Sequence, residues 1–233
     1  MASRRTREPV SPAPPADDFP KYATRQSLAR FLARYELFKL QLEVKGSIVE
    51  CGVHQGGGLL TWAKLSAALE PYSLHRHVIG FDTFEGFPSI HAKDRPTRAD
   101  NRDLRPGGLG TGTDVYEELT ERIREYDENR FLNQYQKVFL VKGDAVQTIP
   151  AFIASNTHLL VSLLFLDFDL YEPTKVALDS FLPRMSKGAV LAFDEINSAR
   201  WPGETQALLE AMDLRSHRIR KFAMDPNIAY IVL

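Results

Sequence analysis

Short apolar runs alternate with helix-length segments along most of this 233-residue chain, and no other feature restricts its fold as strongly. The runs do not alternate apolar with polar residues, as expected of parallel strands that helices cover on both faces. This βαβα order predicts an α/β fold with a doubly wound, Rossmann-like sheet. The predicted strands are 47–51, 78–81, 138–141, 159–166 and 189–193, and the predicted helices between them are 57–69, 114–129, 145–154 and 173–183.

The two ends of the folded region add a helix before this pattern and a strand pair after it. Apolar residues at intervals of three and four predict an amphipathic helix over 24–42. After a helix over 201–212, two further strands are predicted at 218–222 and 228–233. If that pair is a hairpin, one of the seven strands runs antiparallel, an ending that fits methyltransferases better than dinucleotide dehydrogenases.

A single domain over 19–233 is expected, because a chain of this length with 44% apolar residues can bury one sizeable core. The proline-, serine- and charge-rich residues 1–18 are expected to form a disordered leader. Residues 84–113 show little periodicity and contain a glycine tract at 107–112. Loops this long are usually functional, so we expect a lid with glycine hinges.

The net charge indicates which binding partners to expect, and the cysteine content indicates the cellular compartment. With a formal net charge of −1 and a pI near 6.6, neither nucleic acid nor an anionic membrane is an expected partner. We find no apolar stretch typical of a signal peptide or a membrane span. The lone Cys51 fits a reducing cytoplasm. We therefore expect a cytoplasmic protein whose partner is a small molecule.

A glycine-rich turn follows the first predicted strand and opens a helix, with Glu50, Gly52, His54, Gly56 and Gly57 as candidate cofactor-binding residues. In a doubly wound sheet the ligand lies beyond the carboxyl end of the strand, where glycines expose backbone and a helix start offers free N–H groups. The glycines miss the dinucleotide spacing G-x-G-x-x-G, and the acidic residue comes before the turn. This difference favours S-adenosylmethionine over NAD, although the glycines alone are also explained by a tight strand-to-helix turn.

The next two strand ends carry aspartates at the same edge of the sheet. Asp82, followed by Thr83, is placed to accept hydrogen bonds from both ribose hydroxyls of such a ligand. Asp144, followed by Ala145, is placed to bind an adenine amino group and also to cap the following helix. A solvated strand end and a simple helix cap are the alternatives. These four residues and Asp167 complete the candidate cofactor set.

The fourth and fifth strands also end in acidic residues, Asp167 and the pair Asp194–Glu195. If both strands lie near the middle of the sheet, the three carboxylates converge and raise one another's pKa unless a cation neutralises them. Hard oxygen ligands suit Mg²⁺ or Mn²⁺. Such an ion would bind substrate oxygens and lower the pKa of a hydroxyl that attacks a sulfonium methyl group, which also makes Asp167 a candidate catalytic residue. The alternative is a set of solvated loop acids.

Four segments of the sequence match the pattern of one enzyme family. They are Val-Glu-Cys-Gly-Val at 49–53, Asp-Thr-Phe-Glu-Gly-Phe-Pro at 82–88, Leu-Asp-Phe-Asp-Leu-Tyr-Glu-Pro-Thr at 166–174, and Leu-Pro at 182–183 followed by Gly-Ala-Val-Leu-Ala-Phe-Asp at 188–194. On these segments the chain resembles the metal-dependent O-methyltransferases of macrocin and mycinamicin sugar biosynthesis, which are class I S-adenosylmethionine-dependent methyltransferases. The resemblance extends over about 47–197, and the Asp-x-Asp-x-Tyr-Glu-x-Thr block is its most specific part.

The resemblance implies a class I methyltransferase fold, S-adenosylmethionine as methyl donor, and Mg²⁺ (or Mn²⁺) held by Asp167, Asp194 and Glu195. It implies a metal-assisted O-methyltransferase that acts on a hydroxyl of a natural-product small molecule, above all a sugar moiety in antibiotic or other secondary-metabolite biosynthesis. The acceptor would be a glycosylated natural product or a nucleotide sugar. Because the N-terminal helix and lid of relatives often pack across subunits, a homo-oligomer is also expected.

This chain departs from the family's pattern at three points. Glu195 stands where the family usually has a second aspartate, and His54 stands where a Trp-Arg pair often begins. The sugar-directed members carry a histidine late in the lid, and this lid has none there. His91, early in the lid, is therefore the candidate general base, since a neutral imidazole accepts a proton near neutral pH. Asp169 and Glu172 are alternatives.

Two other functions stay open on sequence grounds. An NAD-dependent oxidoreductase would use a similar sheet, although the glycine spacing argues against it. A non-catalytic or repurposed relative is the second, because cephalosporin-hydroxylation proteins look similar to this family. Neither the acceptor nor the methylated position follows from the sequence.

Overall fold

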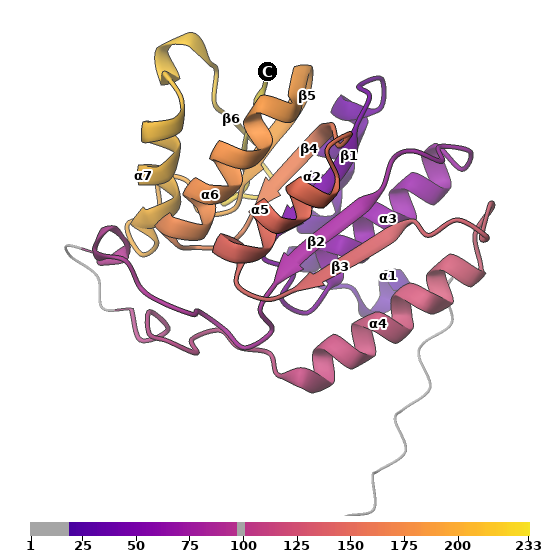
Figure 1. Ribbon diagram of the computed structural model, residues 1–233, viewed down its shortest axis with the longest axis horizontal. Helices are drawn as coiled ribbons and strands as arrows, with labels where there is room; N and C mark the ends of the chain where they lie inside the picture. Colours follow the sequence, from indigo (N-terminus) through magenta and orange to yellow (C-terminus); the bar gives the residue numbers. More distant parts are fainter. Residues whose placement is uncertain (1–18, 97–100) are drawn as a thin grey trace, which may run out of the picture.

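The computed structural model describes residues 19–96 and 101–233, and within them a seven-stranded sheet forms the centre of the fold. The strand order is β3-β2-β1-β4-β5-β7-β6. β1 to β5 pair in parallel, and β7 pairs antiparallel with both β5 and β6. The doubly wound sheet with an antiparallel ending is therefore confirmed (Figure 1). The expected leader at 1–18 and positions 97–100 of the expected lid lie outside the described residues.

The strands follow the apolar runs closely where both faces are buried. Every residue of β1 and β4 is buried, which explains why neither run contains alternating polar positions. The fifth strand begins earlier than the predicted position 189, because its first residues include the exposed Ser186 and Lys187. The strands are β1 (Ser47–Cys51), β2 (Val78–Asp82), β3 (Val138–Lys142), β4 (Val161–Leu166), β5 (Met185–Phe193), β6 (Arg220–Lys221) and β7 (Ala229–Val232).

The helices α2 (Arg25–Gln41), α3 (Gly57–Leu69) and α4 (Thr113–Glu128) cover one face of the sheet, preceded by the short α1 (Phe19–Tyr22). The Thr24 hydroxyl accepts the Ser27 N–H at 3.1 Å and so caps the start of α2. The apolar sides of these helices pack with side chains from β1, β4 and β5 into one continuous core.

The helices α5 (Ala145–Ser155), α6 (Tyr171–Phe181) and α7 (Pro202–Ala211) cover the opposite face (Figure 1). α6 begins two residues before its predicted start, with Pro173 in the first turn, where a missing N–H breaks no helical hydrogen bond. Two short 3₁₀ turns, η3 (Leu182–Arg184) and η4 (Leu214–Ser216), lie in the C-terminal third. No helix in the described ranges is long and apolar enough to cross a membrane.

The described part of the lid, residues 84–96 and 101–113, folds back on itself and is fastened to the helices. Phe87 exchanges backbone hydrogen bonds with the glycine tract: its N–H donates to Gly108 O at 3.1 Å, and its carbonyl accepts the Gly107 N–H at 2.9 Å. The 3₁₀ turn η2 (Ala92–Asp94) places the buried Asp94 carboxylate where it accepts the Tyr171 N–H at 2.6 Å. These contacts position the lid over the carboxyl ends of the parallel strands.

Candidate active site

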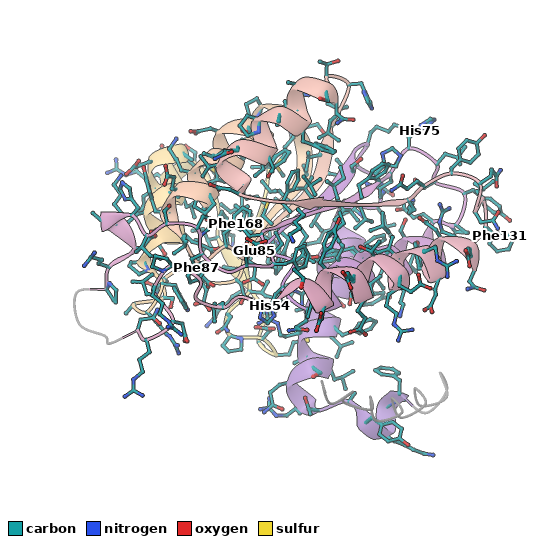
Figure 2. The ribbon with its side chains drawn as sticks, turned by 60° about the horizontal axis from the view of Figure 1, so that its bottom comes forward. His54, His75, Glu85, Phe87, Phe131 and Phe168 are labelled. Atoms are coloured by element: carbon teal, nitrogen blue, oxygen red, sulfur yellow. The ribbon has the colours of Figure 1, made fainter. Side chains whose placement is uncertain are left out.

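A cavity of 310 Å³ lies at the carboxyl ends of the central parallel strands, beneath the lid. Such a position is where open α/β sheets bind ligands, and the volume falls in the range of about 300–1,000 Å³ that small-molecule sites occupy. Figure 2 shows His54, Glu85, Phe87 and Phe168 at this end of the sheet, with His75 and Phe131 at the other. The lining residues are Gly52, His54, Asp82, Thr83, Gly86, Phe87, Pro88, Ser89, Gly108, Leu109, Gly143, Asp144, Ala145, Val146, Asp167, Phe168, Asp169, Leu170 and Pro173.

The turns after β1 and β2 are fixed to each other by the carboxylate of Asp82. One oxygen accepts the His54 N–H at 2.8 Å, and the other accepts the Phe84 N–H at 2.6 Å. His54 and Phe84 both have positive φ angles, of 49° and 59°, which these hydrogen bonds stabilise. Because each carboxylate oxygen has a further acceptor position, Asp82 can still bind ligand hydroxyls from its place in the cavity wall.

The glycine of the first turn lets two strand ends meet. Gly52 has a φ of 94°, and a Cβ at this position would overlap the backbone carbonyl of Asp167. Only a glycine permits this approach, since the conformation and the space both exclude a side chain. The structure thereby brings the predicted cofactor residue Gly52 and the predicted cofactor, metal and catalytic residue Asp167 together in the cavity wall.

Asp144 lies two residues after β3 and caps α5, with its side chain accepting the Val146 N–H at 3.0 Å. It also lines the cavity together with Ala145. The capping role expected from the sequence is therefore present, and the predicted contact with adenine is compatible with it but stays a prediction.

Three of the predicted cofactor residues do not line the cavity. Glu50 is buried beneath α2 and α3, with its carboxylate 3.6 Å from the Arg34 guanidinium, and burial raises its pKa to about 7. Gly56 is the N-cap of α3 with a φ of 82°, and a Cβ there would overlap the Leu119 side chain, whereas Gly57 has open space around it. The N-cap position and its packing explain Gly56 as part of a tight strand-to-helix turn, whereas a cofactor contact by Glu50 stays a prediction.

The acidic residues that follow β4 and β5 form one cluster. Burial and then the nearby Asp194 and Asp169 carboxylates raise the pKa of Asp167 well above its ordinary value. Burial and then the Glu195 carboxylate raise the pKa of Asp169 to about 8. Burial likewise raises the pKa of Glu195, opposed by a hydrogen bond from the Ser198 side chain. The cluster is thus deficient in positive charge, and the structure brings Asp167, Asp194 and Glu195 to adjoining strand ends.

Arg30 on α2 is a residue of this cluster that the sequence did not reveal. Its Nη2 atom lies 2.7 Å from Asp194 Oδ1 and 3.8 Å from Asp167 Oδ2. Asp194 lies 164 positions along the chain from Arg30, so no local pattern indicates the contact.

Glu204 on α7 is a second such residue, and it holds the loops that carry the cluster. Its side chain is fully buried, with Oε1 accepting the N–H groups of Phe168 at 3.1 Å and Asp169 at 3.3 Å. Its Oε2 atom accepts the Glu195 N–H at 3.1 Å. Burial and then the charges of Asp169 and Asp167 raise the pKa of Glu204 well above its ordinary value. The loops after β4 and β5 are therefore joined through one carboxylate.

The donor set of the cluster suits a hard divalent cation, because carboxylate oxygens that repel one another gain from a positive charge between them. In the described ranges, however, no three His, Cys, Asp or Glu side chains are placed to hold a metal ion together. The Arg30 guanidinium lies between Asp167 and Asp194 instead. Asp167, Asp194 and Glu195 thus fit Mg²⁺ by the chemistry of their oxygen donors.

His91, the predicted general base, is not among the residues that line the cavity. Its Nδ1 atom accepts the Lys93 N–H at 3.1 Å, and its ring centroid lies 4.8 Å from that of Tyr171. Asp169, one of the alternatives, does line the cavity. The catalytic role of His91 stays a prediction.

Comparison with known proteins identifies similar chains that share this fold. Residues 24–212 match the family model described as macrocin-O-methyltransferase (TylF). The crystal structure of CalS11, a calicheamicin methyltransferase, is 32% identical, and the match covers 95% of this chain and 86% of that one with a TM-score of 0.89. An apo structure of CalS11, described as a TDP-rhamnose 3′-O-methyltransferase, is 30% identical, covers 95% of this chain and 87% of that one, and gives a TM-score of 0.80.

A curated relative from Streptomyces olivaceus is a methyltransferase that acts on the 4′-oxygen of 8-demethyl-8-(2,3-dimethoxy-α-L-rhamnosyl)-tetracenomycin C. It is 33% identical over 153 residues, which make up 65% of this chain and 53% of the relative. The chain therefore spans about half the length of this relative. The O-methyltransferase NovP is 20% identical with a TM-score of 0.63, covers 88% of this chain and 79% of that one, and supports the fold alone.

Proposed function

This chain belongs to the macrocin-O-methyltransferase family, and from that membership we propose that it methylates a sugar hydroxyl with S-adenosylmethionine as the donor. The observation that carries the proposal is the cavity beneath the lid, where residues from successive strand ends meet. Gly52 comes directly after β1, Asp82 is the last residue of β2, and Asp144 comes two residues after β3. An NAD-dependent oxidoreductase receives no comparable support from this site.

The proposed cofactor extends across these strand ends. Asp82 would accept hydrogen bonds from the ribose hydroxyls, and Asp144 would accept one from the adenine amino group. Phe168 and Pro173 supply apolar walls in the same cavity. The methionine end would lie beside Gly52, near the turn that Asp82 fixes.

In the proposed reaction, the acceptor hydroxyl oxygen forms a bond to the methyl carbon in line with the carbon–sulfur bond, which breaks. S-Adenosylhomocysteine leaves as a neutral thioether, and the hydroxyl proton passes to a carboxylate or imidazole base. Asp169 is better placed for this proton than His91, because Asp169 lines the cavity. A Mg²⁺ or Mn²⁺ ion held by Asp167, Asp194 and Glu195 would supply a Lewis acid that lowers the pKa of the acceptor hydroxyl.

A deoxysugar of the rhamnose type is the proposed acceptor, carried by a natural product or by a nucleotide in antibiotic biosynthesis. The support is that both CalS11 and the tetracenomycin enzyme act on rhamnose derivatives, according to their descriptions. The cytoplasmic location and the homo-oligomer expected above stay predictions.

Calorimetry with S-adenosylhomocysteine and with NAD⁺, followed by mass spectrometry of TDP-rhamnose incubated with S-adenosylmethionine, tests the proposal. We expect S-adenosylhomocysteine to bind, NAD⁺ not to bind, and the sugar to gain one methyl group. Asp82→Asn is expected to weaken S-adenosylhomocysteine binding about tenfold through loss of a charge-assisted hydrogen bond. Glu85→Gln is the control, because it removes an exposed carboxylate from the same loop. Binding of NAD⁺ alone would overturn the proposal.

A further inference from the structure

The Arg30 side chain reaches from α2 into the acid cluster at the carboxyl edge of the sheet. Its guanidinium donates a hydrogen bond to Asp194 Oδ1 at 2.7 Å, and the same nitrogen lies 3.8 Å from Asp167 Oδ2. Asp194 retains 9% of its side-chain exposure and Asp167 retains 25%, so water screens this contact only in part. The Arg30 guanidinium thus bridges the first residues after β4 and β5, which are neighbouring strands.

We propose that Arg30 and a divalent cation are alternative occupants of the space between Asp167 and Asp194, so that the inward position of Arg30 prevents metal binding. The inference rests on the metal-assisted part of the proposed function. Its basis is that the Arg30 guanidinium lies against both carboxylates, 2.7 Å from Asp194 Oδ1 and 3.8 Å from Asp167 Oδ2, where an ion held by the two would also have to lie.

The Arg30–Asp194 distance is too short for a metal ion to bind the same carboxylate oxygen while Arg30 stays in place. Mg²⁺ binds carboxylate oxygens at about 2.0–2.1 Å and keeps waters in its remaining positions. An ion bound to Asp194 Oδ1 would bring its positive charge and its waters against the Arg30 nitrogen that now lies 2.7 Å from that oxygen. At such a separation the two cations repel each other.

The negative charge of the acid cluster attracts both the Arg30 guanidinium and a divalent cation. The Asp169, Glu195 and Glu204 carboxylates lie close enough to influence one another and the bridged pair. The Arg30, Arg34 and Arg200 guanidinium groups offset part of this negative charge, and a divalent ion between Asp167 and Asp194 would offset more of it. The Arg30 side chain is one-third exposed, so it has room to swing toward solvent when the ion enters.

A Mn²⁺ titration of the full chain tests the competition, with the free aquo ion measured by electron paramagnetic resonance. If Arg30 is inward in about nine molecules of ten, Arg30→Gln should bind Mn²⁺ about tenfold more tightly than the wild type, because the binding-competent fraction rises to one. Arg25→Gln is the matched control: it removes the same charge from an exposed position at the start of the same helix. We expect its affinity to stay within about twofold of the wild type.

Equal or weaker Mn²⁺ binding by Arg30→Gln, or no binding by either protein, would overturn the inference. Circular dichroism shows whether each variant is folded, and Arg30→Lys, expected to bind with intermediate affinity, provides a second variant. S-Adenosylhomocysteine calorimetry on the same samples separates the two proposals. Cofactor binding without tighter Mn²⁺ binding refutes the competition alone, whereas tighter Mn²⁺ binding without cofactor binding refutes the methyl donor alone.

Discussion

Glu50 makes the stability of this fold depend on pH in a direction opposite to that of an ordinary ion-paired carboxylate. Burial raises its pKa in the folded chain to about 7, from an ordinary value of 4.5, even though the Arg34 guanidinium lies 3.6 Å away. The folded state therefore binds a proton that the unfolded state releases between these two values. The resulting stabilisation is complete below pH 4.5 and is lost as the pH rises through 7.

The size of this effect follows from the two pKa values. A tenfold change in proton affinity corresponds to about 1.4 kcal/mol, so the full loss is about 3 kcal/mol. Integration of the two titration curves places about 2 kcal/mol of that loss between pH 5.5 and pH 8. Glu50→Gln keeps the shape of the protonated side chain and removes the titration. The free energy of unfolding of Glu50→Gln minus that of the wild type should therefore rise by about 2 kcal/mol over this interval.

Urea denaturation at pH 5.5 and pH 8, followed by circular dichroism, measures this difference. Subtraction of the wild type removes the contributions of the other buried carboxylates, which are present in both proteins. Glu43→Gln is the control, because Glu43 is exposed near the end of α2, and its difference should change by less than about 0.5 kcal/mol. A difference for Glu50→Gln that is the same at both pH values would refute the assignment of a buried, protonating Glu50.

Four further substitutions test the packing around the site and the adenine contact. Gly58→Ala should lower the free energy of unfolding by about 1–3 kcal/mol in urea melts, because its Cβ would overlap Glu50 Oε1, whereas Gly57→Ala, with open space, should be neutral or stabilising. Glu204→Ala should lower it by at least about 3 kcal/mol in the same assay, because three backbone N–H groups lose their acceptor. Asp144→Ser should retain the α5 cap but weaken S-adenosylhomocysteine binding in calorimetry, and equal affinity would argue against the adenine contact.

Most of the sheet could be predicted because its central strands are buried on both faces and therefore read as unbroken apolar runs. β1 and β4 show this most clearly. The start of β5 could not be found in this way, since Ser186 and Lys187 are exposed and polar at a place where the strand has left the core. The antiparallel ending was predicted from two short runs, although β6 itself comprises only two residues.

The candidate site could be predicted as far as it follows from topology. Parallel strands end at one edge, so Gly52, Asp82, Asp144 and Asp167 were expected to meet there, and all of them line the cavity. The sequence could not show that the Glu50 side chain faces α2 and α3, because a residue near the end of a strand can face either side of the sheet. The roles of Arg30 and Glu204 in the cluster could not be predicted, because their contacts join segments that no local sequence pattern connects.

Glu204 fixes the two loops that carry the acid cluster. Its carboxylate holds the backbone N–H groups of Phe168, Asp169 and Glu195, so the two loops keep their positions without a cation between them. Occupation by a metal ion should then alter side-chain positions more than backbone positions. Under the proposed competition, metal affinity would then depend on whether the Arg30 guanidinium or the ion occupies the space between the Asp167 and Asp194 side chains.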